Sequence, residues 1–561
     1  MRTGFVELPD SDRPVAKDAK RVDDVRADTP VEVTVTLSGP RLPDLDPGAP
    51  GIPRGEFAAR YGTSPDVIEK VRETLERLGL EVGEVSPAAR SMRVKGSAGA
   101  MEDAFNPGLG IYSSPTLGRF RGREGKLEIP AELEDAVTGV FGLDERRMAR
   151  RAKSVELAEP AAHGTGSPLG PVQLAEHYNF PPGDGAGQLI GLAELGGTYF
   201  PDDLQRYRQK YGLPETKVEI VDAGATPPTP EQLEHLPAQA QKQIIDEAGE
   251  VMLDVEIVAG LCPAAKILVF FSTFSEQGWI DLLTKVMQDG PQAVDLLSVS
   301  WGLAEDNPEW SGSALREIDL RLKEAAQQGI TICVAAGDDG SGDMGEDGHC
   351  HVNFPASSPY VLSVGGTMIA DGGEERVWWQ EPGHRFLPDG ESTGGGATGG
   401  GISKVFTRPT WQNVQEARPE LHGVVEAGID GRIVPDVAAL AGPPCYELIF
   451  QGEANGARGT SAATPLWAAL LTRIRAGGRP AGGPTFLTPL LYQAGPGGEP
   501  RGKEACRDVT VGDNTSHPDP GVGFRAGPGY DALSGWGVPD GEKLLASLPA
   551  ASAAARTGGI R

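Results

Sequence analysis

The residues around Ser461 could place a nucleophilic hydroxyl at the start of a helix. Gly459 and Thr460 precede the serine, and small and apolar residues follow it from Ala462 to Leu470. Backbone N–H groups at a helix N-terminus can stabilise the oxyanion of an acyl-transfer reaction. A serine or threonine that merely caps a helix has the same pattern, so the motif alone leaves nucleophile and cap open.

A serine nucleophile needs a base, and histidine is the usual one. Among the eight histidines, only His163, followed by Gly164 and Thr165, resembles the histidine motif of subtilisins. It lies in a stretch rich in Ala, Gly, Pro and Ser rather than at the start of a long helix. This context argues against a catalytic role for His163.

Two carboxylates offer another base. Glu250 and Asp254 lie in a stretch with helical spacing, 231–259, and their i, i+4 separation puts them on one helix face. Adjacent carboxyls resist double ionisation and tend to share a proton. A solvated acidic stripe that includes Asp246, Glu247 and Glu256 would explain the same spacing.

Further acidic residues stand beside glycines near the ends of predicted elements. Asp338 follows the predicted strand 329–335, at the edge where parallel sheets place their sites; a turn acid before glycine is the alternative. Asp508 and Asp531 flank the Gly-rich turn 526–529. Oxygen donors of this kind suit Ca²⁺, and aspartates that cap a turn are equally compatible.

Composition excludes several classes of function. Of 561 residues, 51 are Lys or Arg and 79 are Asp or Glu, which gives a net charge of −28 and argues against nucleic acid or an anionic membrane as partner. Residues 1–160 hold 24 basic and 28 acidic residues, and residues 161–561 hold 27 and 51. Five cysteines without a CxxC pair argue against a disulfide framework or a zinc site. No apolar run approaches the ~20 residues needed to span a bilayer, and the polar start shows no secretory signal.

The composition and the predicted secondary structure change along the chain. Residues 1–151 are expected to form a small α+β domain, with 1–27 flexible and 131–141 helical. The segment 152–171 is expected to be an accessible linker. Strand-like and helical runs alternate over 172–550, which predicts an α/β domain with a parallel sheet and helices on both faces. The tail 551–561 is expected to be flexible.

Five motifs in one order resemble those of the sedolisins, acid-acting serine-carboxyl peptidases with a subtilisin-like fold, and most closely its kumamolisin-like members. They are Glu250-xxx-Asp254, Ser298-Val299-Ser300-Trp301-Gly302, Ala335-Ala336-Gly337-Asp338, the segment 354–367, and Gly459-Thr460-Ser461. The resemblance covers nearly the whole chain as a full-length pro-form. It implies a ferredoxin-like α+β activation propeptide over residues 1–151 and a catalytic domain behind it.

The resemblance assigns a role to each matching position. Ser461 would be the nucleophile, Glu250 the general base, Asp254 its orienting partner, and Asp338 the oxyanion-hole residue. Glu194 and Trp301 would extend the catalytic network. One structural Ca²⁺ would be bound by Asp508, Asp531 and the backbone carbonyls of Val509, Gly527 and Gly529.

These roles predict chemistry in acid. A glutamate with a pKa near ~4.3 can still accept a proton where histidine, near ~6.5, is already protonated. Asp338 can donate a hydrogen bond only while protonated. Asp339 beside it and Arg458 before Gly459 depart from the family pattern, and Asp339 could shift the pH optimum.

The expected protein is therefore a monomeric endopeptidase zymogen that acts on proteins or peptides outside the cytoplasm. Its own propeptide would serve as the intramolecular inhibitor and would be removed by self-cleavage in the linker at low pH. Glu–Lys/Arg contacts between the propeptide and the catalytic domain are expected to weaken as the carboxylates protonate. Two alternatives stay open: a catalytically degenerate, calcium-stabilised binding protein on the same fold, and a histidine-dependent subtilisin-like hydrolase.

Overall fold

The computed structural model describes most of the chain. It covers residues 3–14, 16, 18–115, 118–148, 150–151, 167–345, 347–380, 396–414, 421–422, 430–478, 485–516 and 522–549. Residues 152–166 of the expected linker, with His163, and the tail 551–561 lie outside the described residues. None of the helices in the described part is long and apolar enough to cross a membrane.

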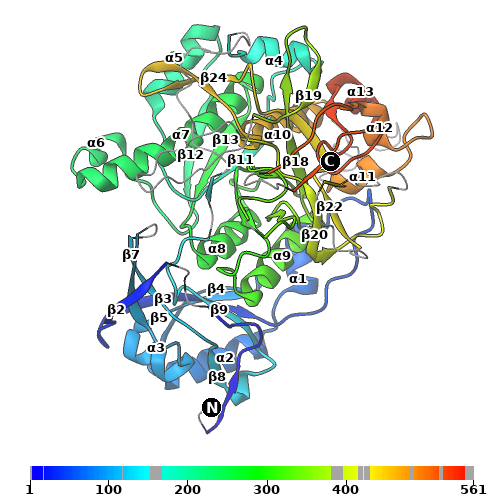
Figure 1. The fold of residues 1–561 in the computed structure, drawn as a ribbon. Coiled ribbons are helices and arrows are strands. Elements are labelled where there is room, and N and C mark those ends of the chain that lie inside the picture. The colour runs from blue at the N-terminus through cyan, green and yellow to red at the C-terminus, as the bar shows by residue number, and fades with distance from the viewer. Residues whose placement is uncertain are drawn as a thin grey trace, which may run out of the picture.

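The N-terminal part of the chain is an α+β domain (Figure 1). Its strands are β1 (Phe5–Glu7), β2 (Lys20–Asp24), β3 (Pro30–Leu37), β4 (Glu81–Ser86), β5 (Ser91–Ser97), β6 (Gly110–Ser114), β7 (Gly118–Gly122), β8 (Glu128–Pro130) and β9 (Val137–Phe141). Its helices are α1 (Arg54–Tyr61), α2 (Pro65–Arg77) and α3 (Ala98–Phe105), with a 3₁₀ turn at Ala131–Leu133. The main sheet is antiparallel, in the order β4-β5-β3-β9.

Strand β3 shows why this sheet has two different faces. Its valines, such as Val33 and Val35, enter the core that α2 and α3 close on one side. The alternating threonines Thr34 and Thr36 point the other way and are also buried. Thr34 Oγ1 donates to Asp281 of the second domain, so the polar face of the sheet is the docking face.

Two segments of this domain differ from the expectations. The stretch 1–27, expected to be flexible, contributes β1 and β2, and its Arg13 is buried. The helix expected over 131–141 is wrong: only a 3₁₀ turn forms, and 137–141 is strand β9. Pairing with β3 and burial of Val137, Val140 and Phe141 favour the strand.

The second domain is an α/β domain built on a large sheet. Its central strands are β11 (Leu189–Glu194), β12 (Lys217–Asp222), β13 (Lys266–Phe271), β14 (Leu296–Val299), β16 (Thr331–Ala335), β18 (Leu362–Ile369), β19 (Glu375–Val377) and β23 (Val437–Leu440). The order is β12-β13-β11-β14-β16-β18, with β23 parallel and β19 antiparallel to β18. All neighbours from β12 to β18 run parallel.

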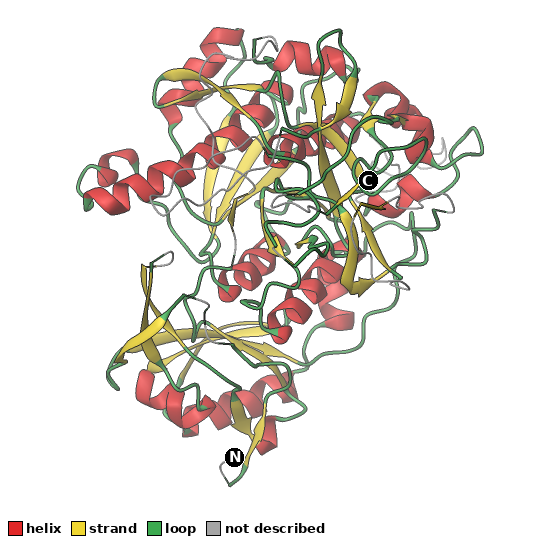
Figure 2. Cartoon of the chain, in the orientation of Figure 1, coloured by secondary structure: helices red, strands yellow, loops and turns green. Residues whose placement is uncertain are grey.

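Helices cover both faces of this sheet (Figure 2). The principal ones are α7 (Ala238–Leu261), α8 (Glu276–Val286), α9 (Gly312–Gln327) and α10 (Thr460–Ala476). One core cluster lies where α7 and α10 pack, and a second lies under α8 and α9. The predicted fold, a subtilisin-like parallel sheet covered on both sides, is confirmed.

Shorter elements surround this framework. The helices are α4 (Pro171–His177), α5 (Pro201–Tyr211), α6 (Pro230–Leu233), α11 (Thr488–Tyr492), α12 (Arg501–Ala505) and α13 (Gly541–Ser547). The strands are β10 (Arg150–Arg151), β15 (Trp301–Ala304), β17 (Asn353–Phe354), β20 (Gly401–Thr407), β21 (Leu421–His422), β22 (Gly431–Val434), β24 (Tyr446–Phe450), β25 (Glu453–Ala457), β26 (Cys506–Arg507), β27 (Gly523–Phe524) and β28 (Val538–Pro539). The single helix expected over 231–259 is divided into α6 and α7, because Pro237 stands at the start of α7 and restricts the residue before it.

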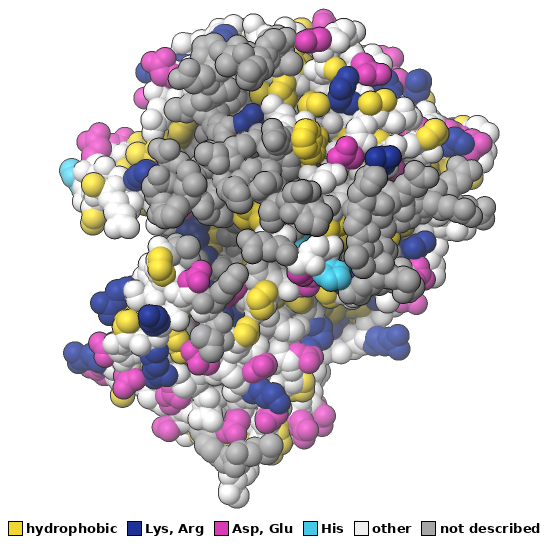
Figure 3. Space-filling model, viewed as in Figure 1, with side chains coloured by type: hydrophobic (Ala, Val, Ile, Leu, Met, Phe, Trp, Pro, Cys, Tyr) yellow, Lys and Arg dark blue, Asp and Glu magenta, His cyan; other side chains and the backbone are white. Residues whose placement is uncertain are grey.

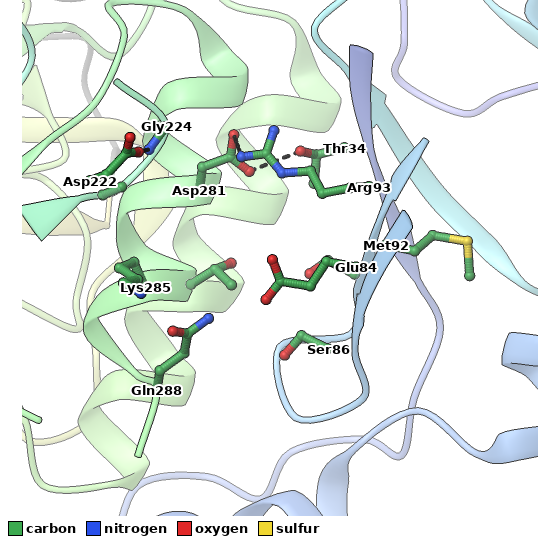
Figure 4. A pocket seen from close by; sticks show the side chains of 13 residues that line it. Thr34, Glu84, Ser86, Met92, Arg93, Asp222, Gly224, Asp281, Lys285 and Gln288 are labelled. Atoms are coloured by element: carbon green, nitrogen blue, oxygen red, sulfur yellow. Dashed lines mark hydrogen bonds and ion pairs between the residues drawn. The ribbon is translucent and has the colours of Figure 1, made fainter. Parts of the chain in front are cut away.

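The two domains meet where α8 and α9 face the sheet of the N-terminal domain (Figure 1). Buried charges line this interface. Arg93 and Thr34 of the N-terminal domain contact Asp281 on α8 beside a small cavity (Figure 4). On the face shown in Figure 3, basic and acidic side chains intermingle over the N-terminal domain, as its nearly balanced charge predicts.

Candidate active site

Helix α7 buries the two carboxylates that its spacing brings together. Glu250 and Asp254 are both 0% exposed, and every residue from 247 to 261 is buried. The interpretation as a solvated stripe therefore fails for this half of the helix. Buried carboxyls of like charge, one turn apart, are expensive to ionise together.

A third carboxyl joins them from the end of a central strand. Glu194, the last residue of β11, is 0% exposed, and Trp301 Nε1 donates to its Oε2 at 3.1 Å. Burial, and then the charge of Glu250, raise the pKa of Glu194 well above its usual value. Burial, Glu194 and Glu250 raise the pKa of Asp254 in the same way. The three carboxyls thus form one electrostatic group, in which Glu194 and Asp254 retain their protons beside Glu250.

Ser300 connects this group to the helix that carries Ser461. Its hydroxyl lies 3.0 Å from each carboxylate oxygen of Asp254 and 3.3 Å from the carbonyl oxygen of Ser461. Sequence reasoning did not single out Ser300, although it lies inside a motif that was recognised. Ser300 lies between Val299 and Trp301, directly after the buried strand β14. This position was the signal that could have identified it.

Ser461 lies in the first turn of α10, directly after a sharp bend at Gly459. The serine is 0% exposed, and its Oγ has no hydrogen-bond partner among the described residues. Gly459 has φ of +128°, and a Cβ there would lie 2.6 Å from Asp338 Oδ2 and 3.0 Å from Ser461 Oγ. Glycine is therefore required at this position, and Ser461 and Asp338 converge on it.

Asp338 is held in place by the residue before the serine. It stands three residues after β16, behind Gly337 with φ of +107°. Its Oδ1 accepts hydrogen bonds from Thr460 N at 2.8 Å and Thr460 Oγ1 at 2.7 Å. Its Oδ2 lies on the side of Gly459 and Ser461. Thr460 lies inside the recognised Gly459-Thr460-Ser461 motif, but its contact with Asp338 was not predicted.

The arrangement places a hydroxyl, a carboxyl beside it and a proton-retaining carboxyl cluster in one buried region. Such a set can remove a proton from an alcohol and supply one to an oxyanion. Two of the described histidines have acidic partners of their own. His177 bonds Glu375, and His351 bonds Asp306 and Asp347.

The candidate calcium turn is also formed. Asp508 Oδ2 accepts from Gly529 N at 2.7 Å, and Asp531 Oδ2 accepts from Gly527 N at 3.2 Å. Burial raises the pKa of Asp508, and raises that of Asp531 to about 6. Two partly desolvated carboxyls beside one Gly-rich turn fit a hard cation. No cluster of three or more His, Cys, Asp or Glu in the described residues could hold a metal, so this set depends on backbone carbonyls such as that of Val509.

Comparison with known proteins assigns the family. Residues 239–500 match the subtilase family, and residues 48–146 match the pro-kumamolisin activation domain. Kumamolisin from Bacillus sp. (strain MN-32) is 35% identical over 518 residues, which cover 89% of this chain and 86% of that protein. The chain belongs to the sedolisin family of serine-carboxyl peptidases.

Two further comparisons, with a curated relative and with a solved structure, also match members of the sedolisin family. Tripeptidyl-peptidase sed5 from Aspergillus fumigatus is 29% identical, over 96% of this chain and 97% of that protein. The solved structure of Pseudomonas sedolisin complexed with two molecules of pseudo-iodotyrostatin aligns with a TM-score of 0.53 at 24% identity. It covers 71% of this chain and 100% of that one, and shows the shared fold. This sedolisin is a peptidase zymogen whose N-terminal domain is its activation propeptide.

Proposed function

We propose that this sedolisin is an acid-active serine endopeptidase in which Ser461 is the nucleophile and Glu250 the general base. Asp254 orients Glu250 and shares its proton, and Asp338 stabilises the oxyanion. The observation that carries the proposal is the buried carboxyl cluster, joined through Ser300 to the turn that holds Ser461 and Asp338.

The proposed reaction moves one proton at a time. Ser461 Oγ attacks the scissile carbonyl carbon, and its proton passes to the Glu250 carboxylate. The oxygen of the tetrahedral intermediate accepts a hydrogen bond from protonated Asp338 through Oδ2, since Thr460 occupies Oδ1. Glu250 then protonates the leaving amine. In the second half, Glu250 takes a proton from water while the water oxygen attacks the acyl carbon. Glu250 then returns this proton to Ser461 Oγ as the ester bond breaks, which releases the carboxylic acid product and restores the serine hydroxyl and the Glu250 carboxylate.

The network supports work in acid. Glu194 and Asp254 have pKa values raised well above normal, so these groups stay protonated at low pH and leave Glu250 as the carboxyl that exchanges its proton. Trp301 orients Glu194 by its hydrogen bond. We expect activity to be lost towards neutral pH, because Asp338 must keep a proton to donate to the oxyanion.

A calcium ion at the Gly-rich turn belongs to the same proposal. Asp508, Asp531 and the carbonyls of Val509, Gly527 and Gly529 would hold it. Its role would be structural: it would neutralise two carboxyls that burial has partly stripped of water.

The test uses mass analysis of the full chain before and after a shift to pH 4, beside Ser461→Ala. We expect the wild type to lose its propeptide within 152–171 and to gain peptidase activity, while the variant stays intact. If a folded wild type neither splits nor cleaves a peptide at any pH, the binding-protein alternative takes the place of the peptidase. Maximal activity at pH 7 or above would contradict the carboxylate mechanism.

A further inference from the structure

The propeptide leaves its own domain as an extended chain beside the candidate active site. Met148 N donates to Phe274 O at 2.6 Å, and Trp279 Nε1 donates to Met148 O at 3.2 Å. Strand β10 then pairs antiparallel with β15, with Arg151 opposite Trp301. A peptide added to a strand edge in this way is held by its backbone, and its side chains are read by pockets.

One side chain of this segment, Arg147, occupies such a pocket. Its Nη2 lies 2.8 Å from Glu247 Oε1, and its guanidinium carbon lies 3.5 Å from the centre of the Phe274 ring. A carboxylate on one side and an aromatic face on another are the two partners that a guanidinium prefers.

The catalytic domain holds the carboxylate of this pocket by itself. Glu247 Oε2 accepts from Gly197 N at 3.2 Å, and Oε1 accepts from Gln243 Nε2 at 3.1 Å. The Glu247 side chain is 11% exposed, whereas that of Arg147 is 31% exposed. The pocket is therefore formed by residues that remain when the propeptide has gone.

The pocket adjoins the catalytic network. Glu247 lies one turn before Glu250 on α7, and Gly197 lies three residues after Glu194. The Phe274 ring packs edge-on against Trp301, with ring centres 5.3 Å apart. A peptide that reaches Ser461 along β15 thus passes this pocket.

We propose that Glu247 and Phe274 form a substrate subsite selective for Arg or Lys, which Arg147 occupies in the zymogen. Arg147 stands four residues before Arg151, the residue opposite Trp301. The subsite therefore receives the side chain at that distance on the N-terminal side. The inference rests on the proposed peptidase function and adds a substrate class to it: peptides with a basic residue at this distance on the N-terminal side of the cleaved bond.

The test compares two peptides cleaved by enzyme processed from the full chain. One reproduces residues 144–166 between a fluorophore and a quencher; the other has citrulline in place of Arg147, which removes the charge and keeps the shape. We expect kcat/KM to be at least roughly ten-fold higher for the arginine peptide, the effect of one hydrogen bond between charged groups. In Glu247→Gln the ratio should fall towards one, and in Phe274→Leu it should fall in part.

The control is Asp246→Asn, which removes an exposed carboxylate from the neighbouring position of α7 and should leave the ratio unchanged. Equal cleavage of both peptides by the wild type overturns the subsite while the peptidase function stands. A wild-type preference that survives in Glu247→Gln also overturns it. Cleavage of neither peptide by a folded wild type, as in Ser461→Ala, overturns the peptidase function and the subsite together.

Discussion

Replacing Asp281 by asparagine tests how the propeptide interface responds to acid. Asp281 lies on α8 with a side chain 9% exposed, 3.0 Å from Arg93 Nη2, and accepts a hydrogen bond from Thr34 at 2.8 Å (Figure 4). Burial raises its pKa to about 6, although Arg93 and Thr34 oppose the shift. The ordinary value is 3.8.

The sign of the effect follows from this raised pKa. Above about pH 6 the buried carboxylate is charged, and its desolvation lowers the free energy of unfolding. The difference between 3.8 and about 6 corresponds to about 3 kcal/mol, at ~1.4 kcal/mol per pH unit. That cost disappears as the pH falls from 6 to 4, so Asp281 makes the zymogen more stable in acid. This Asp–Arg pair is therefore expected to respond to acid in the opposite sense to the Glu–Lys/Arg contacts for which weakening is predicted.

Asparagine mimics the protonated aspartate, and Arg93 keeps Glu32 at 3.6 Å as a partner. In the Ser461→Ala background, which prevents self-cleavage, we expect Asp281→Asn to raise the free energy of unfolding at pH 7 by up to about 3 kcal/mol. At pH 4 the gain should vanish. Urea unfolding of both proteins at half-unit pH steps measures the difference. A difference that is constant with pH, or a variant that loses stability at pH 7, would refute the reasoning.

Asp144 provides the matched comparison, because its pKa moves the other way. Burial alone would raise the pKa of Asp144, but the guanidinium groups of Arg13 and Arg146 outweigh it and hold the pKa below 3.8. Its stabilising contribution is present above the ordinary aspartate pKa and is lost only as the pH falls through the lower value. Asp144→Asn should therefore destabilise the zymogen at pH 7, whereas Asp281→Asn should not. The ion pairs of Asp144 lie within the N-terminal domain, where they hold Arg13 and Arg146, and these two arginines also pair with Glu276 and Glu309 of the second domain.

Three other predictions concern the candidate sites. Ser300→Ala should lower kcat/KM by about 10- to 100-fold and shift the acid limb of the pH profile, because Asp254 loses a donor to both oxygens; an unchanged profile would remove Ser300 from the network. Gly459→Ala should abolish cleavage while Gly478→Ala, also at positive φ but with open space around its Cβ, should not; an active Gly459→Ala enzyme would show that the approach to Asp338 can relax. Chelation with EDTA should lower the melting temperature by several degrees, since an ion at 100 times its Kd contributes about 2.7 kcal/mol; unchanged melting would argue against a calcium site.

Much of the fold could be predicted because its signals are local. Short apolar strands alternate with helices from β11 to β16, and each was visible as a run bounded by turns. The errors lie where tertiary pairing overrides local spacing. The segment 137–141 has helical spacing, yet β3 offers it an unpaired strand edge and a buried face.

The residues of the candidate site could be predicted from motifs. Their pKa values depend on burial, which the periodicity of the sequence does not show. Asp246 and Glu250 belong to one acidic stretch, yet Asp246 is exposed and Glu250 is 0% exposed. The difference arises because α10 packs against the C-terminal half of α7 while the N-terminal half projects past the sheet (Figure 1). Only in the half of α7 that α10 covers can burial raise the pKa values of carboxyl groups, so that these groups keep their protons.

The same argument separates Asp144, within the N-terminal domain, from Asp281, at the interface between the domains. Asp144 and Asp281 both face arginine, and from sequence both would be expected to lose stabilising contacts in acid. Asp144 has two guanidinium groups against its burial, and its pKa falls; Asp281 has one, with Thr34, and its pKa rises. Whether a buried carboxyl makes the zymogen less or more stable in acid therefore depends on how many cations the fold brings to it. Arg146 is a near neighbour of Asp144, but Arg13 and Arg93 lie more than 100 positions from Asp144 and Asp281, so the local sequence alone does not give the sign.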